Sequence, residues 1–150
     1  MSFTFLDYDR ISGDDIDLVI DFKAPGDERL GIVPAYHYGM VLHGTYERVG
    51  VIDLRVGYSE SLYYGGNIGY SVLPAYRGRR FAAQACRLLR PLALAHGMEK
   101  LYITCNPDNA PSRKTCESLG ARLAGIVDLP PDNDMYLRGE RQKCIFEWTL

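Results

Sequence analysis

The chain has 150 residues, of which 47% are hydrophobic, and its formal net charge is −2. This length and composition suffice for one hydrophobic core, so we expect a single domain over residues 1–150. The charge balance argues against general nucleic-acid binding, and no apolar run approaches the roughly 20 residues that a membrane span needs.

Cysteine and histidine usage argues against a metal centre. The four cysteines form no Cys-x-x-Cys pair, and the three histidines do not cluster. We therefore predict no metal site and four reduced, buried thiols. Because the N-terminus has no basic region followed by an apolar segment, the sequence predicts a cytoplasmic protein.

The first thirty residues are acidic. Their acidic side chains are Asp7, Asp9, Asp14, Asp15, Asp17, Asp21, Asp27 and Glu28, against the basic Arg10, Lys23 and Arg29. This surplus either attracts a cationic amine or caps helices and solvates a surface. Ile16, Val19, Ile20 and Phe22 recur at near-helical spacing, which predicts one helix or two short ones here.

The middle of the chain predicts strands followed by a long helix. Residues 36–43 and 48–58 read as two strands joined by a hairpin turn at residues 44–47, and residues 68–73 follow as a central strand. An apolar stripe over residues 81–95 predicts a helix that ends at His96-Gly97. Pro91 removes a backbone donor inside it, so we expect a kink or a break near Arg87.

A cationic loop joins the central strand to the long helix. It carries Arg77, Gly78, Arg79 and Arg80. A helix start leaves about four backbone N–H groups without intrahelical partners and has a positive dipole end, so phosphate oxygens are its natural ligands. The alternative interpretation is an ordinary solvated helix start. The loop lacks the Lys-Ser/Thr pair of a P-loop and the three glycines of a dinucleotide fold.

The last third predicts a strand, a short helix and two further strands. Residues 100–105 read as a strand, after which Asn109 is the expected N-cap, Pro111 lies in the first turn and Gly120 follows the helix end. A strand around residues 123–129, a loop over residues 130–141 and a closing strand over residues 143–150 complete the chain. These elements predict an α+β fold with a helix on each face of a sheet.

Two segments carry a resemblance to the GNAT superfamily of acyl-CoA-dependent N-acetyltransferases. The cationic loop resembles motif A, Arg/Gln-x-x-Gly-x-Gly/Ala, with Arg77 first, Ala82 last and Arg80 in place of the central glycine. About thirty residues further on, the chain resembles Asn-x-x-Ser/Ala followed by a helix, with Asn109 and Ser112 at the two named positions.

The resemblance extends to both flanks of these segments. Leu119-Gly120-Ala121 is similar to the Leu-Gly-Phe/Ala end of the family's second segment. Residues 64–72 resemble the strand before motif A in a subgroup of predicted acetyltransferases, in which a histidine stands where this chain has Asn67. A neutral amide cannot act as a base, so Asn67 is excluded from that role.

The resemblance implies a three-layer fold whose mixed, mostly antiparallel central sheet is flanked by helices, and it implies acetyl-CoA as co-substrate without a metal. Motif A amides would hold the coenzyme pyrophosphate, and Asn109 would reach the pantetheine arm. A backbone N–H at Val72 or Leu73 would polarise the thioester carbonyl. The expected cofactor-binding residues are Val72, Leu73, Arg77, Gly78, Arg79, Arg80, Phe81, Ala82, Asn109 and Ser112.

The resemblance also implies direct attack of a neutral amine on the thioester, which needs an acid and a base. Many members use a tyrosine as the acid, and Cys116 stands at its position, with Tyr70 and Tyr136 as alternative acids. Glu60 and His43 are candidate bases. The expected catalytic residues are Glu60, Tyr70 and Cys116.

We therefore expect an acetyl-CoA-dependent N-acetyltransferase for a primary amine, with a small molecule preferred as acceptor. Three alternatives stay open: acetylation of a protein N-terminus or lysine, a non-catalytic acyl-CoA-binding module, and acyl-enzyme chemistry at Cys116. The apolar face of the closing strand also allows a homodimer. Neither nucleic acid nor a membrane is an expected partner.

Overall fold

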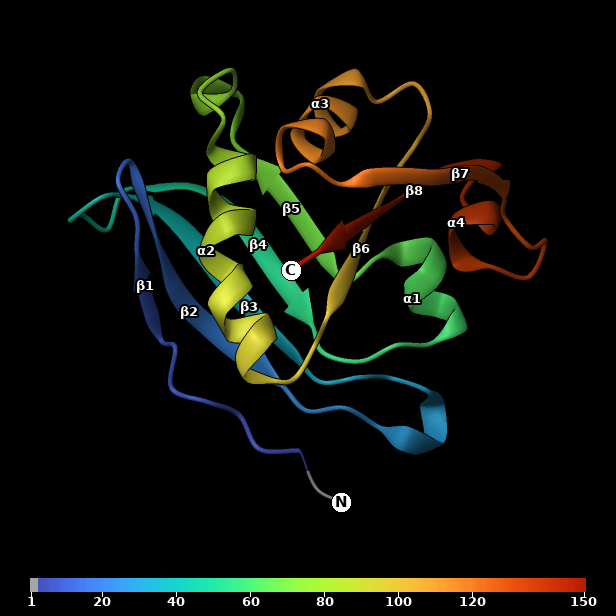
Figure 1. The fold of residues 1–150 in the computed structure, drawn as a ribbon, viewed down its shortest axis with the longest axis horizontal. Coiled ribbons are helices and arrows are strands. Elements are labelled where there is room, and N and C mark those ends of the chain that lie inside the picture. The colour runs from blue at the N-terminus through green and yellow to red at the C-terminus, as the bar shows by residue number, and fades with distance from the viewer. Residues whose placement is uncertain (1–2) are drawn as a thin grey trace.

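The computed structural model describes residues 3–150, whose strands form two antiparallel sheets (Figure 1). The larger sheet has the order β1-β2-β3-β4-β5, and the smaller has the order β6-β8-β7. The strands are β1 (Arg10–Ser12), β2 (Ile16–Ala24), β3 (Ala35–Leu42), β4 (Arg48–Arg55), β5 (Ile68–Val72), β6 (Lys100–Cys105), β7 (Arg122–Asp128) and β8 (Gln142–Thr149). The helices are α1 (Glu60–Gly65), α2 (Phe81–Ala95), α3 (Ala110–Ser118) and α4 (Asp134–Leu137), with 3-10 turns at Glu28–Leu30 and Pro74–Tyr76. This arrangement confirms the expected α+β fold with antiparallel sheets flanked by helices. Of the helices in residues 3–150, α2 packs on the larger sheet, whereas α1 and α3 pack on the smaller one, so the far face of the larger sheet lacks the helix that we predicted there.

The N-terminal segment is the main correction to the sequence prediction. It forms strands β1 and β2 instead of a helix. Strand β2 pairs with β3 over nearly its whole length, and Ile16 and Leu18 are buried in the core. Because β-branched residues such as Ile16, Val19 and Ile20 favour strands, this long-range pairing outweighs the near-helical spacing.

The hairpin of β3 and β4 is confirmed, although β4 ends earlier than predicted. Strand β3 pairs with β4, and β4 pairs with β5. After Arg55 the chain leaves the sheet and forms α1, a helix that the sequence analysis did not predict. Ser59 caps this helix, because its hydroxyl accepts a hydrogen bond from the Leu62 N–H at 3.2 Å.

Helix α2 lies across one face of the larger sheet and covers it (Figure 1). Its side chains in the core include Phe81, Ala85, Leu89 and Leu92, as the apolar stripe predicts. The helix is continuous through Pro91, so the predicted break near Arg87 does not occur. Packing of the buried face offsets the cost of the proline, about 3 kcal/mol. The predicted end is confirmed, with Gly97 at a φ of 77°.

Asn67 joins the two sheets at the point where β5 and β6 begin. Its backbone N–H donates to the carbonyl of Tyr102 at 2.7 Å, and its side-chain oxygen accepts from the Tyr102 N–H at 2.9 Å. Its side-chain NH2 donates to the carbonyls of Arg55 (3.1 Å) and Gly57 (2.8 Å). Asn67 is 0% exposed. Beyond it, β5 and β6 belong to different sheets and diverge into a V (Figure 1).

The predicted elements of the last third are confirmed, with one addition. Pro111 lies in the first turn of α3, and Gly120 follows the helix at a φ of 77°. Strand β8 lies between β6 and β7, and both faces of its middle are buried. The segment predicted as a loop over residues 130–141 contains the short helix α4. The four cysteines are free and buried, as predicted.

Candidate active site

A cleft of about 990 Å³ occupies the V between β5 and β6. One wall consists of β5, the loop after it and the first turn of α2, and the other wall consists of the end of β6 and α3. Of the expected cofactor residues, Val72, Arg77, Gly78, Arg80, Phe81, Ala82, Asn109 and Ser112 line this cleft, whereas Leu73 and Arg79 do not. The fold therefore brings the two motif segments to opposite sides of one cavity.

The start of α2 is open toward the cleft. Arg80 is its N-cap residue, and no side chain makes a capping hydrogen bond there, so the first amides of α2 are left for an anion. Among residues 3–150, Arg80 is the one non-glycine residue with a positive φ, at 61°. The backbone thus keeps the left-handed conformation that suits the glycine of the motif, at a cost of about 1–2 kcal/mol.

The arginines of this loop have different surroundings. The Arg77 Nε donates to the carbonyl of Val72 at 3.0 Å, which ties the loop to the end of β5. The guanidinium carbon of Arg79 lies 5.5 Å from the ring centroid of Tyr76. The Tyr76 hydroxyl in turn donates to Glu47 at 2.7 Å. Arg77 and Arg80 line the cleft, whereas Arg79 supports the loop from outside it.

The hydrogen bonds of β5 show which of its amides point into the cleft. The Leu73 N–H donates to the carbonyl of Val49 at 2.8 Å, so it is engaged by β4 and is not the carbonyl donor that we predicted. Because bonding direction alternates along an antiparallel pair, the N–H groups of Ile68, Tyr70 and Val72 point away from β4, toward the V. Val72 keeps its predicted position, and the Tyr70 N–H is an additional donor that the sequence analysis missed.

A pair of hydroxyl groups connects the two walls. The hydroxyl oxygens of Tyr70 and Ser112 are hydrogen-bonded at 2.6 Å. Ser112 is held in place by Asn109, whose side-chain oxygen accepts from the Ser112 N–H at 3.2 Å and caps α3 as predicted. Burial raises the pKa of Tyr70 well above its usual range, so this phenol stays protonated. It can donate to a developing negative charge.

The two other predicted catalytic side chains lie outside the cleft lining. Cys116 is 0% exposed. Burial, with Cys105 and Cys144 nearby, raises the pKa of Cys116 to about 12, so its thiol is a poor nucleophile at neutral pH. Glu60 is an exposed residue at the start of α1.

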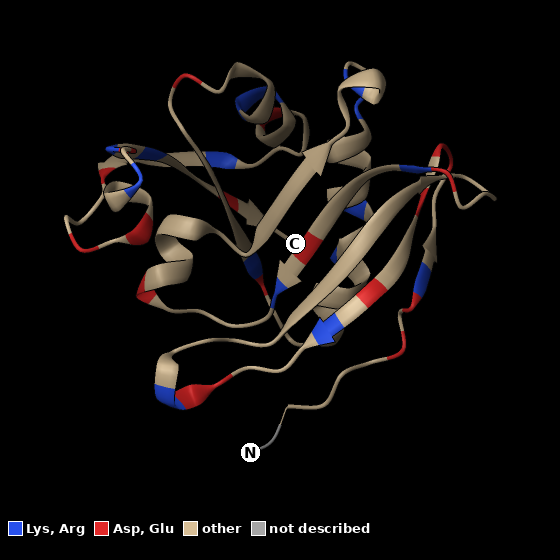
Figure 2. Cartoon of the chain, turned by 180° about the vertical axis from the view of Figure 1, so that it is seen from behind, with Lys and Arg blue, Asp and Glu red and all other residues tan. Residues whose placement is uncertain are grey.

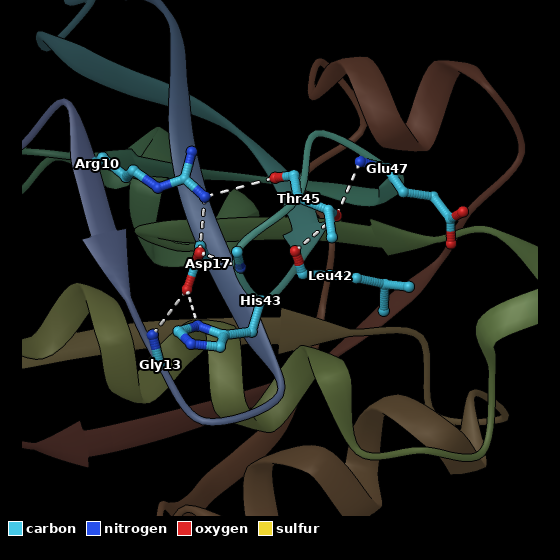
Figure 3. A network of polar contacts seen from close by, with 8 residues as sticks. Arg10, Gly13, Asp17, Leu42, His43, Thr45 and Glu47 are labelled. Carbon is cyan, nitrogen blue, oxygen red and sulfur yellow. Dashed lines mark hydrogen bonds and ion pairs between the residues drawn. The ribbon is translucent and has the colours of Figure 1, made fainter.

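Two alternative residues from the sequence analysis are also elsewhere. Tyr136, in α4, lies under the guanidinium of Arg141, 3.9 Å from carbon to ring centroid. His43 belongs to a polar network at the end of the β3–β4 hairpin (Figure 3). The structure brings neither side chain into the cleft lining.

Asp17 is the centre of that network (Figure 3). Its carboxylate is 1% exposed and accepts hydrogen bonds from Arg10 (2.7 Å), the Gly13 N–H (3.1 Å), His43 (2.8 Å) and the Gly44 N–H (2.9 Å). Burial alone would raise the pKa of Asp17, but these donors outweigh it and hold the pKa well below its usual range. The network fixes the hairpin that supports the cationic loop through Glu47.

Sequence reasoning missed several cleft residues. Lys114 lines it from α3, and Lys143 lines it from β8, where its Nζ donates to Glu140 at 2.7 Å. Asn106 also lines the cleft, and its side-chain oxygen is buried without a hydrogen-bond partner. Asn106 directly follows β6, the strand predicted over residues 100–105, so its place at the strand end was the available signal. Lys143 carries no local signal, because the pairing of β8 with β6 brings it there.

Residues 3–150 contain neither a metal-binding cluster nor a membrane-spanning helix. No cluster of three or more His, Cys, Asp or Glu side chains in this range is arranged to hold a metal ion. None of the helices in the same range is long and apolar enough to cross a bilayer.

Comparisons with known proteins place the fold. A family model described as "Acetyltransferase (GNAT) domain" matches residues 18–122. A GNAT-family acetyltransferase from Bacillus anthracis has a TM-score of 0.59 and 22% identity, covering 75% of this chain and 65% of its own. The microcin C7 self-immunity acetyltransferase MccE, solved with acetyl-CoA and AMP, has a TM-score of 0.60 and 18% identity. The similarity covers 77% of this chain and 61% of MccE.

A probable GNAT-family acetyltransferase from Chromobacterium violaceum ATCC 12472 is similar over nearly the full chain, with a TM-score of 0.69, 16% identity, and coverage of 99% of this chain and 90% of its own. No curated protein sequence matches. This chain spans less than two thirds of the Bacillus protein and of MccE. Because these three proteins are at most 22% identical to this chain, their similarity shows the fold alone. Because the family model matches more than half of its residues, the chain belongs to the GNAT acetyltransferase family.

Proposed function

We propose that this protein is an acetyl-CoA-dependent N-acetyltransferase that acts on a primary amine. The observation that carries the proposal is the V-shaped cleft. It has the uncapped start of α2 at its mouth and amides of β5 along one wall. A phosphate group fits the first feature, and a chain of amides ending in a thioester fits the second.

Cationic side chains support the assignment of the mouth to the coenzyme phosphates. Arg77, Arg80 and Lys114 line the same cleft as Phe81, Ala82 and Ala83 of the first turn of α2. Charge-assisted contacts of this kind are stronger than neutral ones, and they act together with the helix dipole. MccE, which has the same fold, was solved with acetyl-CoA bound.

The thioester would lie deeper, along β5. The N–H of Tyr70 or Val72 would stabilise the negative charge that develops on the carbonyl oxygen. Nitrogen attack forms the C–N bond, and the C–S bond then breaks. The Tyr70 hydroxyl donates its proton to the departing sulfur and recovers one from the new amide nitrogen, so the phenol is regenerated. Ser112 keeps this hydroxyl in position.

The acceptor is proposed to be a small molecule, and acetylation of a protein N-terminus or lysine is the alternative. A non-catalytic acyl-CoA-binding module is the second alternative, favoured by the absence of a histidine at Asn67 and a tyrosine at Cys116. Release of free CoA in the presence of an amine distinguishes an enzyme from a binding module. Cytoplasmic location and a homodimer stay predictions.

The test is calorimetric titration of the protein with acetyl-CoA. We expect micromolar binding that Arg77→Ala and Asn109→Ala both weaken. The matched controls are Arg79→Ala, which removes a neighbouring arginine outside the cleft lining, and Asn133→Ala, which removes the N-cap of α4. An equal loss of acetyl-CoA affinity in the two control variants, or no acetyl-CoA binding by the folded wild type, would overturn the proposal.

A further inference from the structure

A row of four residues crosses the larger sheet on the face opposite α2. Strand pairing places Phe22 beside His37, His37 beside Asp53, and Asp53 beside Gly69. The neighbours Ile52 and Leu54 are buried in the core. Since successive side chains of a strand point to opposite faces, Asp53 points away from α2.

This face of the sheet is open. Figure 2 views the molecule from behind, with the strands in front of α2, and no helix formed by residues 3–150 lies across the strands' centre. Phe22 is 57% exposed and stacks on His37 with ring centroids 4.2 Å apart. Val51, two residues before Asp53, is also exposed. A molecule can therefore approach the row directly, and the row offers it an apolar wall.

Gly69 is the point where this face and the cleft adjoin. It lines the cleft, and a Cβ on it would lie 2.8 Å from the Asp53 Oδ1 and 2.9 Å from the Arg55 Nη2. The carboxylate therefore lies against the backbone of β5, next to Tyr70. The absence of a side chain at position 69 leaves room for Asp53 there and places the carboxylate beside the strand along which the thioester would lie.

Asp53 retains capacity to accept a proton. Its Oδ2 lies 2.9 Å from the Arg55 Nε, yet it lacks a well-aligned hydrogen bond, so the contact is an ion pair without hydrogen-bond geometry. The side chain is 15% exposed. In contrast, no Asp, Glu or His side chain is among the described residues that line the cleft. A carboxylate or imidazole base for the acceptor amine would therefore lie beyond that lining.

We propose that Asp53 is the catalytic base, and that a primary ammonium with an apolar body reaches the thioester from the open face across Gly69. This rests on the proposed acetyl transfer. The ammonium gives one proton to the Asp53 carboxylate and becomes the neutral nucleophile. After the C–N bond forms and the C–S bond breaks, Asp53 releases that proton to water, and the second nitrogen proton replaces the one that Tyr70 gave to sulfur.

The surroundings of Asp53 set its response to pH. Burial raises its pKa, and Arg55 and His37 oppose the rise. Arg55 faces it from its own strand and His37 from β3, whereas the facing residue on β5 is Gly69, which has no side chain. A carboxyl group with a raised pKa is a stronger base than an ordinary one.

The experiment compares Asp53→Asn with wild type, using acetyl-CoA and 2-phenylethylamine as the probe acceptor. At pH 7 we expect kcat/KM for the amine to fall by about 100-fold, with the Kd of acetyl-CoA unchanged. As the pH approaches the amine's own pKa near 10, more amine is neutral without a base, so the defect should shrink to about tenfold or less. Asp21→Asn, which removes an ion-paired carboxylate on β2, is the matched control and should change little.

A second pair of variants tests the position of the carboxylate. Gly69→Ala pushes against the Asp53 and Arg55 side chains and should reduce turnover while acetyl-CoA still binds. Gly125→Ala, on β7, meets no atom within 4 Å and should behave as wild type. The proposal is overturned by full activity of Asp53→Asn at pH 7, by a defect that is equal at pH 7 and 10, or by wild-type protein that binds acetyl-CoA yet does not acetylate the probe. Failure to bind acetyl-CoA would instead reject the proposed function itself.

Discussion

The hydroxyl oxygen of Tyr70 on β5 lies 2.6 Å from the hydroxyl oxygen of Ser112 on α3, and the pair spans the cleft. Tyr70→Phe keeps the ring and removes the donor. We expect kcat for CoA release to fall by about 100-fold while the Kd of acetyl-CoA stays within about twofold, because the hydroxyl acts when sulfur leaves. Steady-state kinetics and calorimetry measure the two quantities.

Cys116→Ser is the control for that prediction. Because Cys116 is buried outside the cleft lining, its variant should keep turnover within about threefold of wild type once folding is verified. A large loss in Cys116→Ser, together with normal activity in Tyr70→Phe, would contradict the assignment of the acid. That result would favour acyl-enzyme chemistry instead.

Arg80 combines a strained backbone with a cleft-lining charge, and two substitutions separate the effects. Arg80→Gly and Arg80→Ala both remove the guanidinium, so both should weaken acetyl-CoA binding by about tenfold. Only glycine relieves the left-handed φ, so the free energy of unfolding should be about 1 kcal/mol higher for the glycine variant. Denaturant titration measures this difference, and equal stability of the two variants would argue against strain.

Asn67 should be a determinant of stability. Asn67→Ala removes three side-chain hydrogen bonds and leaves buried partners on Arg55, Gly57 and Tyr102 unpaired. We expect a loss of about 3 kcal/mol in unfolding free energy. By comparison, Asn133→Ala, at the cap of α4, should cost about 1 kcal/mol. Thermal and denaturant unfolding test the contrast, and equal costs would contradict it.

Asp17 should make the protein sensitive to acid. Its pKa is lowered in the folded state, so the stabilisation is fully present above its usual pKa of 3.8 and is lost as the pH falls below that value. Asp17→Asn should lose about 3 kcal/mol at pH 7. Its unfolding free energy should then fall less steeply than that of wild type between about pH 4 and pH 2. Parallel curves for the two proteins would refute this role.

Local signals predicted the parts of the site that lie close together in sequence. The helix cap at Asn109, the turn at Gly120 and the open start of α2 follow from residue types at fixed positions, and the structure has all three. The side chains that approach through strand pairing gave no such signal. Asp53 reaches Gly69 through the register of β4 and β5, and Lys143 reaches the cleft through β8.

The errors have the same physical origin. The spacing of the apolar residues in the N-terminal segment fits both a helix and a strand. The segment forms a strand because β2 pairs with β3. The position of Leu73 in the motif predicts a carbonyl donor, but its N–H is occupied by the carbonyl of Val49, a partner that only the pairing of β5 with β4 supplies. The resemblance to the family predicts an acid at position 116, but Cys116 is buried and does not line the cleft.

Asn67 joins the two sheets at one point, beyond which β5 has β4 on one side and no paired strand on the other. Exposed edges of this kind usually invite aggregation, and proteins tend to cover them. Here a ligand with amides along its length would take the place of the missing strand. Acetyl-CoA should therefore raise the free energy of unfolding by mass action, and more so at higher concentration. By occupying the edge of β5, it should also prevent that edge from pairing with another molecule.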